Sequence, residues 1–125
     1  MQHQAGFLGL VQQAKQFVIE ITPDQVWTQL NTETPPLLVD VREAQEWESG
    51  ILPGAMGISK GVLERDIEQK IPDKTTPIIF YCSGGFRSVL AADNVQKMGY
   101  THVASMAGGS RAWIERGLPI LAKDW

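Results

Sequence analysis

Apolar residues near the start of the chain recur at helical spacing. The pattern is formed by Phe7, Leu8, Leu10, Val11, Ala14, Phe17 and Val18. It predicts a short helix that ends near Lys15 or Gln16. We therefore expect residues 1–17 to form a helical extension and residues 18–125 to form the main domain. The exposed-looking side chains Phe7, Leu8 and Val11 are compatible with docking on that domain or with recruiting a partner.

Short apolar runs alternate with helical patterns through the rest of the chain. Strands are expected at residues 18–21, 37–41, 77–81 and 101–106, and Ile58 is expected to begin or end a very short one. Helices are expected after the cap residue Thr22 and Pro23, at 43–49, at 62–71, along the apolar face 90–98, and at 111–116 with Ser110 as cap. This alternation is typical of a parallel α/β sheet with right-handed crossovers. Ligands bind such sheets beyond the carboxyl ends of the strands.

Composition fits one ordered globular domain. The chain has 125 residues, of which 43% are hydrophobic and 20% charged, and its formal net charge is −3. No basic excess or basic stripe favours nucleic-acid binding. The short apolar patch near the start lacks the basic region of a signal peptide and the roughly 20 apolar residues of a membrane helix. We expect a soluble cytoplasmic protein that binds neither nucleic acid nor membrane.

The cysteine and histidine content is low. Cys82 is the single cysteine, and the two histidines, His3 and His102, lie far apart in the sequence. One cysteine forms no internal disulfide, and this set of residues disfavours a structural zinc site.

The most informative segment is residues 82–88, which reads CSGGFRS and joins a predicted buried strand to a predicted helix. Gly84 and Gly85 permit backbone angles that turn N–H groups inward, so that the loop forms an anion nest. The helix that follows adds the positive end of its dipole. Arg87 adds a guanidinium group suited to binding oxyanions.

Cys82 lies at the mouth of this predicted nest. Thiols at helix N-termini and beside arginine ionise more readily than free cysteine, so we expect Cys82 to be largely thiolate near neutral pH. Ser83 and Ser88 offer hydroxyl donors, and Phe86 either lines the pocket mouth or fills space. A lone cysteine is often only a small buried apolar residue. Its position between a strand and a glycine-rich loop favours the nucleophile interpretation.

The chain resembles the rhodanese-like family of sulfurtransferases from about Ile21 to Ile120. Four segments carry the resemblance: 37–43, which contains Asp40-Val41-Arg42; 50–55; the loop 82–88; and Gly108-Gly109 with Ala112-Trp113 and Gly117-Leu118-Pro119. Their order is the order of the family's signatures. The resemblance implies a five-stranded parallel sheet flanked by helices, to which this chain adds the short N-terminal helix.

The resemblance also implies a reaction. A donor such as thiosulfate, a polysulfide or a persulfide gives its outer sulfur to Cys82, and the Cys82 persulfide passes it to a thiophilic acceptor such as cyanide or a thiol. A protein persulfide could also serve as donor or acceptor. The resemblance further implies that the reaction needs neither a metal nor an organic cofactor. The loop residues Ser83, Gly84, Gly85, Phe86, Arg87 and Ser88 are the expected substrate-binding set.

Two other functions stay open at this point. One is a non-catalytic rhodanese-like binding or regulatory module, although such modules usually lack the cysteine. The other is a cysteine phosphatase or arsenate reductase, whose loops in related families have one residue more than the four between Cys82 and Arg87. Ser83 stands where many thiosulfate-using members have Arg or Lys, which weakens the pull on a dianion and leaves polysulfide or persulfide donors open. Asp40 and Arg42 are expected to form a buried pair, and Trp113 to belong to the core.

Overall fold

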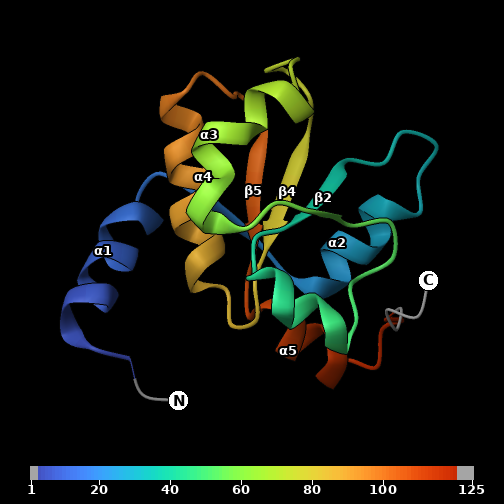
Figure 1. The fold of residues 1–125 in the computed structure, drawn as a ribbon. Coiled ribbons are helices and arrows are strands. Elements are labelled where there is room, and N and C mark those ends of the chain that lie inside the picture. The colour runs from blue at the N-terminus through green and yellow to red at the C-terminus, as the bar shows by residue number, and fades with distance from the viewer. Residues whose placement is uncertain (1–2, 121–125) are drawn as a thin grey trace.

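A computed structural model describes residues 3–120 of the chain. Within them, five strands form one parallel sheet in the order β1-β5-β4-β2-β3 (Figure 1). The strands are β1 (Ile19–Ile21), β2 (Leu37–Asp40), β3 (Met56–Gly57), β4 (Ile78–Tyr81) and β5 (Val103–Met106). The predicted parallel α/β architecture is confirmed.

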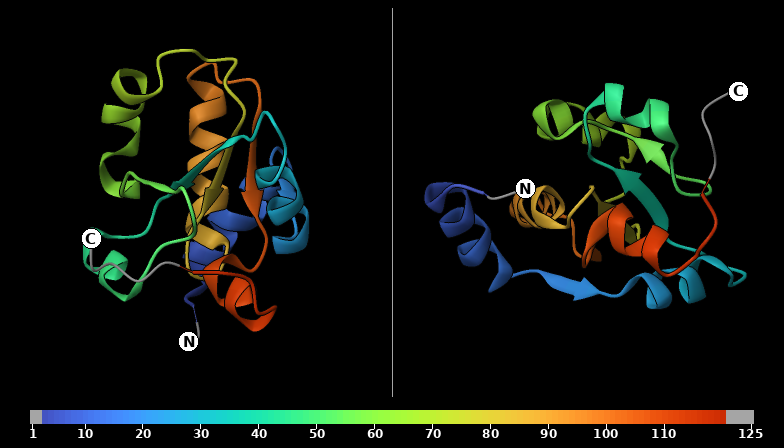
Figure 2. Two further views of the ribbon diagram at one scale, coloured as in Figure 1. Left: turned by 90° about the vertical axis from the view of Figure 1, so that its right-hand side faces the viewer. Right: turned by 90° about the horizontal axis from the view of Figure 1, so that it is seen from below.

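Helices cover both faces of the sheet (Figure 2). They are α1 (Ala5–Lys15), α2 (Pro23–Leu30), the 3₁₀ helix η1 (Ala44–Ser49), α3 (Lys60–Lys70), α4 (Phe86–Lys97) and α5 (Gly109–Glu115). Side chains of α3 and α4 pack with one face of β2 and β4, while α2 and α5 pack on the other face. Trp113 of α5 is fully buried, as predicted. These two apolar layers hold the carboxyl ends of the strands at one edge of the domain.

The start of α2 follows the sequence signal closely. The Thr22 hydroxyl accepts a hydrogen bond from the backbone N–H of Gln25 at 3.2 Å, and the Gln25 side chain accepts one from the N–H of Thr22 at 2.8 Å. Pro23 occupies the first helical position, where its missing N–H costs nothing. This reciprocal capping confirms the predicted helix start.

Two local predictions are wrong. The short strand β3 is Met56–Gly57, so Ile58 follows it and only donates its N–H to the Asp40 carbonyl at 2.9 Å. Ser110 does not cap α5, because the helix begins at Gly109, two residues earlier than predicted, and its cap is Gly108 in the left-handed conformation. The backbone N–H of Ser110 is used elsewhere, as described below.

The N-terminal helix α1 docks on α4. Val11 and Ala14 are buried against Val89, and the Gln96 side chain donates to the Phe17 carbonyl at 2.8 Å. The expectation that Val11 is exposed is therefore wrong, since its exposed fraction is 1%. Docking, the first of the two options left open, is confirmed. The division of the chain at residue 17 stays a prediction.

Neither a membrane-spanning helix nor a metal cluster is found in the described part of the chain. None of the helices within residues 3–120 has the length and apolar character needed to cross a membrane. The same residues contain no group of three or more His, Cys, Asp or Glu side chains placed to hold a metal ion.

Candidate active site

The loop between β4 and α4 carries Cys82 at the carboxyl end of the central strand. Gly85 is the cap of α4 and has φ +95°, a left-handed conformation that favours glycine. A Cβ atom at Gly85 would also lie only 2.9 Å from the backbone nitrogen of Gly108. The glycine at this position is therefore required both by the turn and by the close approach of the neighbouring loop.

Cys82 is a buried residue with an exposed fraction of 1%, and its sulfur atom lies among hydrogen-bonding groups. The backbone N–H of Gly85 donates to Sγ at 3.1 Å, and Sγ lies 3.6 Å from the Ser88 hydroxyl oxygen. The Ser88 hydroxyl in turn shares a 2.7 Å hydrogen bond with the hydroxyl of Ser105 on β5. A negative charge on the sulfur is thus met by a backbone dipole and by a buried chain of hydroxyl groups. Ser105 was not foreseen from the sequence.

A second segment, residues 107–111, contains the turn before α5 and the first residues of that helix, and it fixes the backbone of the cysteine loop. The N–H of Ser110 donates to the Cys82 carbonyl at 2.8 Å, and the N–H of Arg111 donates to the Ser83 carbonyl at 3.1 Å. Gly109 has φ +61°, and a Cβ there would lie 2.5 Å from the Ser83 carbonyl carbon. Only glycine at this position lets the two loops approach closely enough to form these bonds.

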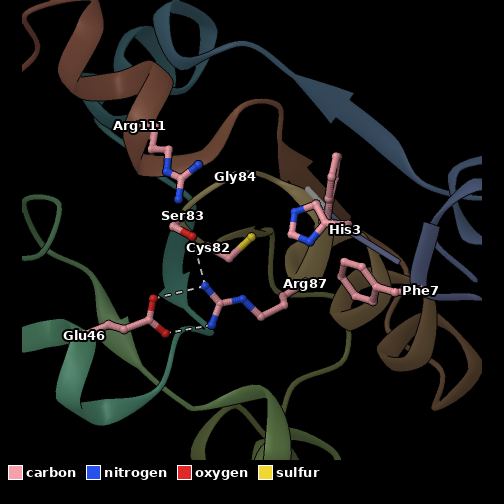
Figure 3. A pocket seen from close by; sticks show the side chains of 9 residues that line it. His3, Phe7, Glu46, Cys82, Ser83, Gly84, Arg87 and Arg111 are labelled. Carbon is pink, nitrogen blue, oxygen red and sulfur yellow. Dashed lines mark hydrogen bonds and ion pairs between the residues drawn. The ribbon is translucent and has the colours of Figure 1, made fainter. Parts of the chain in front are cut away.

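Arg87 is held by Glu46 of η1. Its Nη1 and Nη2 lie 2.7 and 3.1 Å from the two carboxylate oxygens, and Nη2 also donates to the Ser83 hydroxyl at 3.0 Å (Figure 3). The hydrogen bonds to Arg87 lower the pKa of Glu46, and those to Glu46 raise the pKa of Arg87. Arg87 therefore stays positive, but both terminal nitrogens are engaged by protein groups. Its contact with a donor stays a prediction.

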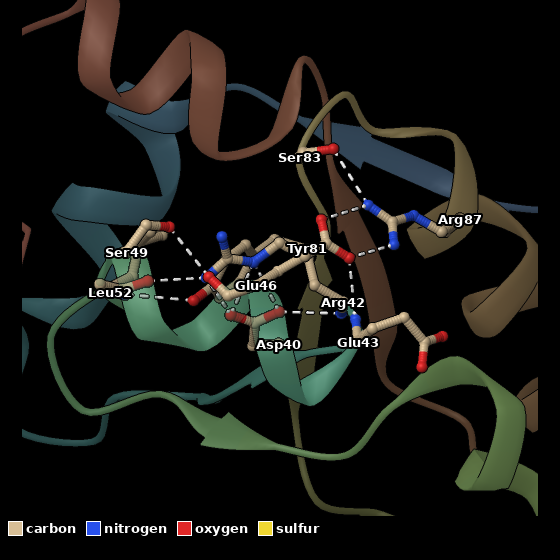
Figure 4. A network of polar contacts seen from close by, with 10 residues as sticks. Asp40, Arg42, Glu43, Glu46, Ser49, Leu52, Tyr81, Ser83 and Arg87 are labelled. Atoms are coloured by element: carbon tan, nitrogen blue, oxygen red, sulfur yellow. Dashed lines mark hydrogen bonds and ion pairs between the residues drawn. The ribbon is translucent and has the colours of Figure 1, made fainter. Parts of the chain in front are cut away.

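Asp40 and Arg42 form the buried pair expected from the sequence. Arg42 Nη2 lies 2.7 Å from Asp40 Oδ2 and also donates to the Gly50 carbonyl at 2.8 Å (Figure 4). The Tyr81 hydroxyl accepts the N–H of Leu52 at 3.1 Å, and burial raises the pKa of this phenol. These contacts tie the carboxyl ends of β2 and β4 to the loop that follows η1. The predicted buried pair is confirmed.

A pocket of about 410 Å³ opens over the cysteine. Its lining includes five predicted residues: Cys82, Ser83, Gly84, Phe86 and Arg87. Gly85 and Ser88 lie behind this surface, where they contact the sulfur. Four lining residues were missed from the sequence: His3, Phe7, Glu46 and Arg111. They come from three other elements or segments, and no local pattern marks them as neighbours of Cys82.

The match to a family model decides the relationship. The model described as "Rhodanese-like domain" matches residues 22–116, which include both loops of the site. This chain belongs to the rhodanese-like family.

Curated relatives and a solved structure agree with this membership. A sulfurtransferase of Allochromatium vinosum is 32% identical over 107 residues, which cover 86% of this chain and 98% of the relative. The thiosulfate sulfurtransferase GlpE of Actinobacillus succinogenes is 33% identical over 101 residues, which cover 81% of this chain and 88% of the relative. A solved structure from Rhodopseudomonas palustris, a protein of unknown function described as a possible tyrosine phosphatase, is 30% identical with a TM-score of 0.79. The likeness covers 96% of this chain and 97% of that one.

Sulfur transfer in general is thus supported for this rhodanese-like chain. The matched segment 22–116 leaves out α1 and the residues before it. His3 and Phe7 therefore reach the pocket from outside the segment that matches the family model, which we call the family module.

Proposed function

We propose that the protein is a sulfurtransferase that carries sulfane sulfur as a Cys82 persulfide. The observation that supports this most directly is the placement of Cys82 Sγ under an open pocket, with the Gly85 N–H 3.1 Å away. A thiolate attacks a sulfane sulfur, and the persulfide that forms is also an anion. The same N–H therefore stabilises the sulfur before and after transfer.

The first half-reaction loads the cysteine. The Cys82 thiolate attacks the outer sulfur of a donor, an S–S bond forms, and the bond between that sulfur and the rest of the donor breaks. With thiosulfate the leaving group is sulfite, with a polysulfide it is a polysulfide one sulfur shorter, and with a persulfide it is a thiol. Electron pairs move with the leaving group, so no outside oxidant or reductant is required.

The second half-reaction unloads the cysteine. A thiophilic acceptor, cyanide or a thiolate, attacks the outer sulfur of the Cys82 persulfide and leaves with it. The Cys82 thiolate is then regenerated in its hydrogen bond with Gly85. The cycle needs Cys82 in its reduced form, which the cytoplasm maintains, so we place the reaction there. A protein persulfide of suitable shape would serve in either half-reaction.

A cysteine phosphatase is the second candidate, because the similar protein from Rhodopseudomonas palustris is described as a possible tyrosine phosphatase. Two features favour sulfur transfer over it. Four residues separate Cys82 from Arg87, which makes a small loop, and the Arg87 guanidinium is paired with Glu46. A phosphate group needs a wider ring of donors and a free arginine fork.

Intact-mass measurement tests the proposal. Wild-type protein is incubated with thiosulfate or with inorganic tetrasulfide under non-reducing conditions and then with cyanide. We expect a gain of one sulfur atom that cyanide removes, and complete loss of that gain in Cys82→Ser. The exposed variant Thr32→Ala is the matched control and is expected to load as the wild type does. Hydrolysis of p-nitrophenyl phosphate, with no sulfur gain from either donor, would contradict the proposal.

A further inference from the structure

Two residues of the N-terminal extension form part of the pocket above Cys82. The His3 ring lies with its centroid 5.1 Å from that of Phe7 and 5.0 Å from that of Phe86. The Phe7 and Phe86 rings are 6.2 Å apart. All three residues line the pocket, and Figure 3 shows the cysteine sulfur directed toward the side where His3 lies. We call these three rings the aromatic wall.

The aromatic wall is held in place by the docking of α1. Phe7 and Phe86 pack against the buried cluster of Val11, Ala14 and Val89. The ammonium group of Lys15 lies 5.6 Å from the centre of the Phe86 ring, a cation–π contact. The rings are therefore fixed by contacts between α1 and α4 that extend well beyond the pocket.

The opposite side of the pocket is polar. Glu46 and Arg87 neutralise each other there, and Ser83 contributes a neutral hydroxyl. The Arg111 guanidinium points toward Ser83, and it has no ion pair within residues 3–120. The pocket thus offers one unpaired cation, one paired cation and three aromatic rings to an incoming donor.

This lining suits one class of donor. Thiosulfate is a compact, strongly hydrated dianion, and its binding gains most from several free cations close together. A polysulfide or an organic persulfide instead presents a polarisable chain of sulfur atoms. Sulfur makes favourable contacts with aromatic rings at about 5 Å, often at the ring edge.

We propose that the aromatic wall of His3, Phe7 and Phe86 is a substrate-binding surface. It binds the sulfur chain of a polysulfide or organic persulfide and thereby selects such donors over thiosulfate. The inference rests on the proposed sulfurtransferase function and adds the class of donor and the part of the chain that recognises it. Specificity on this view comes from the N-terminal extension, whereas the chemistry comes from the family module.

The transfer itself balances without a further reagent. The Cys82 thiolate attacks the outer sulfur of R–S–SH, a new S–S bond forms between Cys82 and that sulfur, and the S–S bond between the inner and outer sulfur atoms of the donor breaks. The electron pair leaves on R–S⁻, which takes up the persulfide proton, so that Cys82 ends as an anionic persulfide. The aromatic wall contacts the inner sulfur of R–S–SH, or the remaining sulfur atoms of an inorganic chain, during this step.

The test measures the rate of Cys82 persulfide formation in single-turnover reactions of the full chain, followed by intact mass. The donors are inorganic tetrasulfide, glutathione persulfide and thiosulfate. The variants are His3→Ala, His3→Phe and Phe7→Leu. Phe7→Leu removes the aromatic ring but keeps apolar volume beneath α1. Phe17→Ala is the matched control, because Phe17 is 68% exposed and lies outside this pocket.

The expected result is a change in donor preference. In His3→Ala and Phe7→Leu, the ratio of the tetrasulfide rate constant to the thiosulfate rate constant falls about fivefold, as does the ratio for glutathione persulfide. His3→Phe keeps the wild-type ratios, because the ring and not the imidazole nitrogen makes the contact. Phe17→Ala also keeps them.

Three outcomes would overturn the inference while leaving the sulfurtransferase intact. The first is that His3→Ala and Phe7→Leu both keep the wild-type rate-constant ratios, and the second is that Phe17→Ala lowers the ratios as much as they do. The third is that only the ratio for glutathione persulfide falls, which would show that the wall binds the organic part of the donor. A wild-type protein that gains sulfur from none of the three donors would instead refute the proposed function itself. Thermal unfolding of each variant, compared with that of the wild type, tests whether the substitution leaves the stability of the fold unchanged.

Discussion

The protein contains two arginine–carboxylate pairs near the carboxyl ends of its strands, and their surroundings differ. Arg42 and Asp40 are enclosed, with side-chain exposures of 6% and 0%. Arg87 and Glu46 stand at the pocket, with exposures of 29% and 32%. Both pairs have a shortest N–O distance of 2.7 Å. The geometry of an ion pair alone therefore does not say what the pair does.

Burial explains the difference. A buried charge that loses its partner has no water to replace it, so the inner pair behaves as a structural unit. An exposed charge that loses its partner is resolvated, so the outer pair contributes little to folding. The outer pair is consequently free to respond to a ligand, while the inner pair keeps β2, β4 and the loop after η1 together.

The largest effect is expected from breaking the inner pair. Arg42→Met leaves the Asp40 carboxylate buried without its guanidinium, and it also removes the bond to the Gly50 carbonyl. We expect the free energy of unfolding to fall by about 3–5 kcal/mol, measured by urea denaturation. The double variant Asp40→Leu/Arg42→Met removes the stranded charge as well and should recover part of this loss. A double variant less stable than the single one would contradict the explanation.

A smaller effect on folding, with a large effect on activity, is expected from Arg87→Met. The half-exposed pair contributes only about 0.2–1 kcal/mol to the free energy of unfolding. Loss of the guanidinium leaves Glu46 as an unpaired anion facing the pocket, which repels anionic donors. We expect kcat/KM for thiosulfate to fall about tenfold, the equivalent of one charge-assisted hydrogen bond. An Arg87→Met protein as unstable as Arg42→Met would erase the contrast between the two pairs.

The smallest effect concerns pH. The hydrogen bonds to Arg87 lower the pKa of Glu46 below its usual 4.5, so the folded state binds this proton less readily than the unfolded chain does. The stabilisation from the pair is therefore present above that usual value and is lost as the pH falls through the lower pKa of the folded state. We expect the stability difference between wild type and Glu46→Gln to stay constant while the pH is well above 4.5 and to shrink as the pH falls below that value. A difference that grows on acidification would show that the sign is wrong.

The parts of the site that were predictable lie close together in the sequence. The loop 82–88 carries its own signals, namely a preceding apolar strand, two glycines and an arginine. The same holds for Asp40 and Arg42, two residues apart at a strand end. The fold class followed from the alternation of strand and helix patterns, each of which is also local.

The missed residues depend on how distant segments meet. Glu46 reaches Arg87 across 41 positions, and Ser105 reaches Ser88 across 17. His3 and Phe7 reach the pocket only because α1 docks on α4, and the helical pattern of α1 does not say which neighbour covers its apolar side. Serine favours the cap position, so the sequence predicts Ser110 there, whereas Gly108 occupies it at the point where the two segments meet.

The order of strands in the sheet also sets the order in which the protein can fold during synthesis. β1 lies at the sheet edge and pairs with β5, the last strand to be made. The carbonyl groups of Cys82 and Ser83 likewise acquire their N–H partners only when residues 110 and 111 arrive. These pairings are non-local, and non-local contacts form slowly. A ribosome-bound chain therefore carries a complete cysteine loop sequence before the candidate active site is assembled. The thiol gains its final environment only when the last quarter of the domain has emerged.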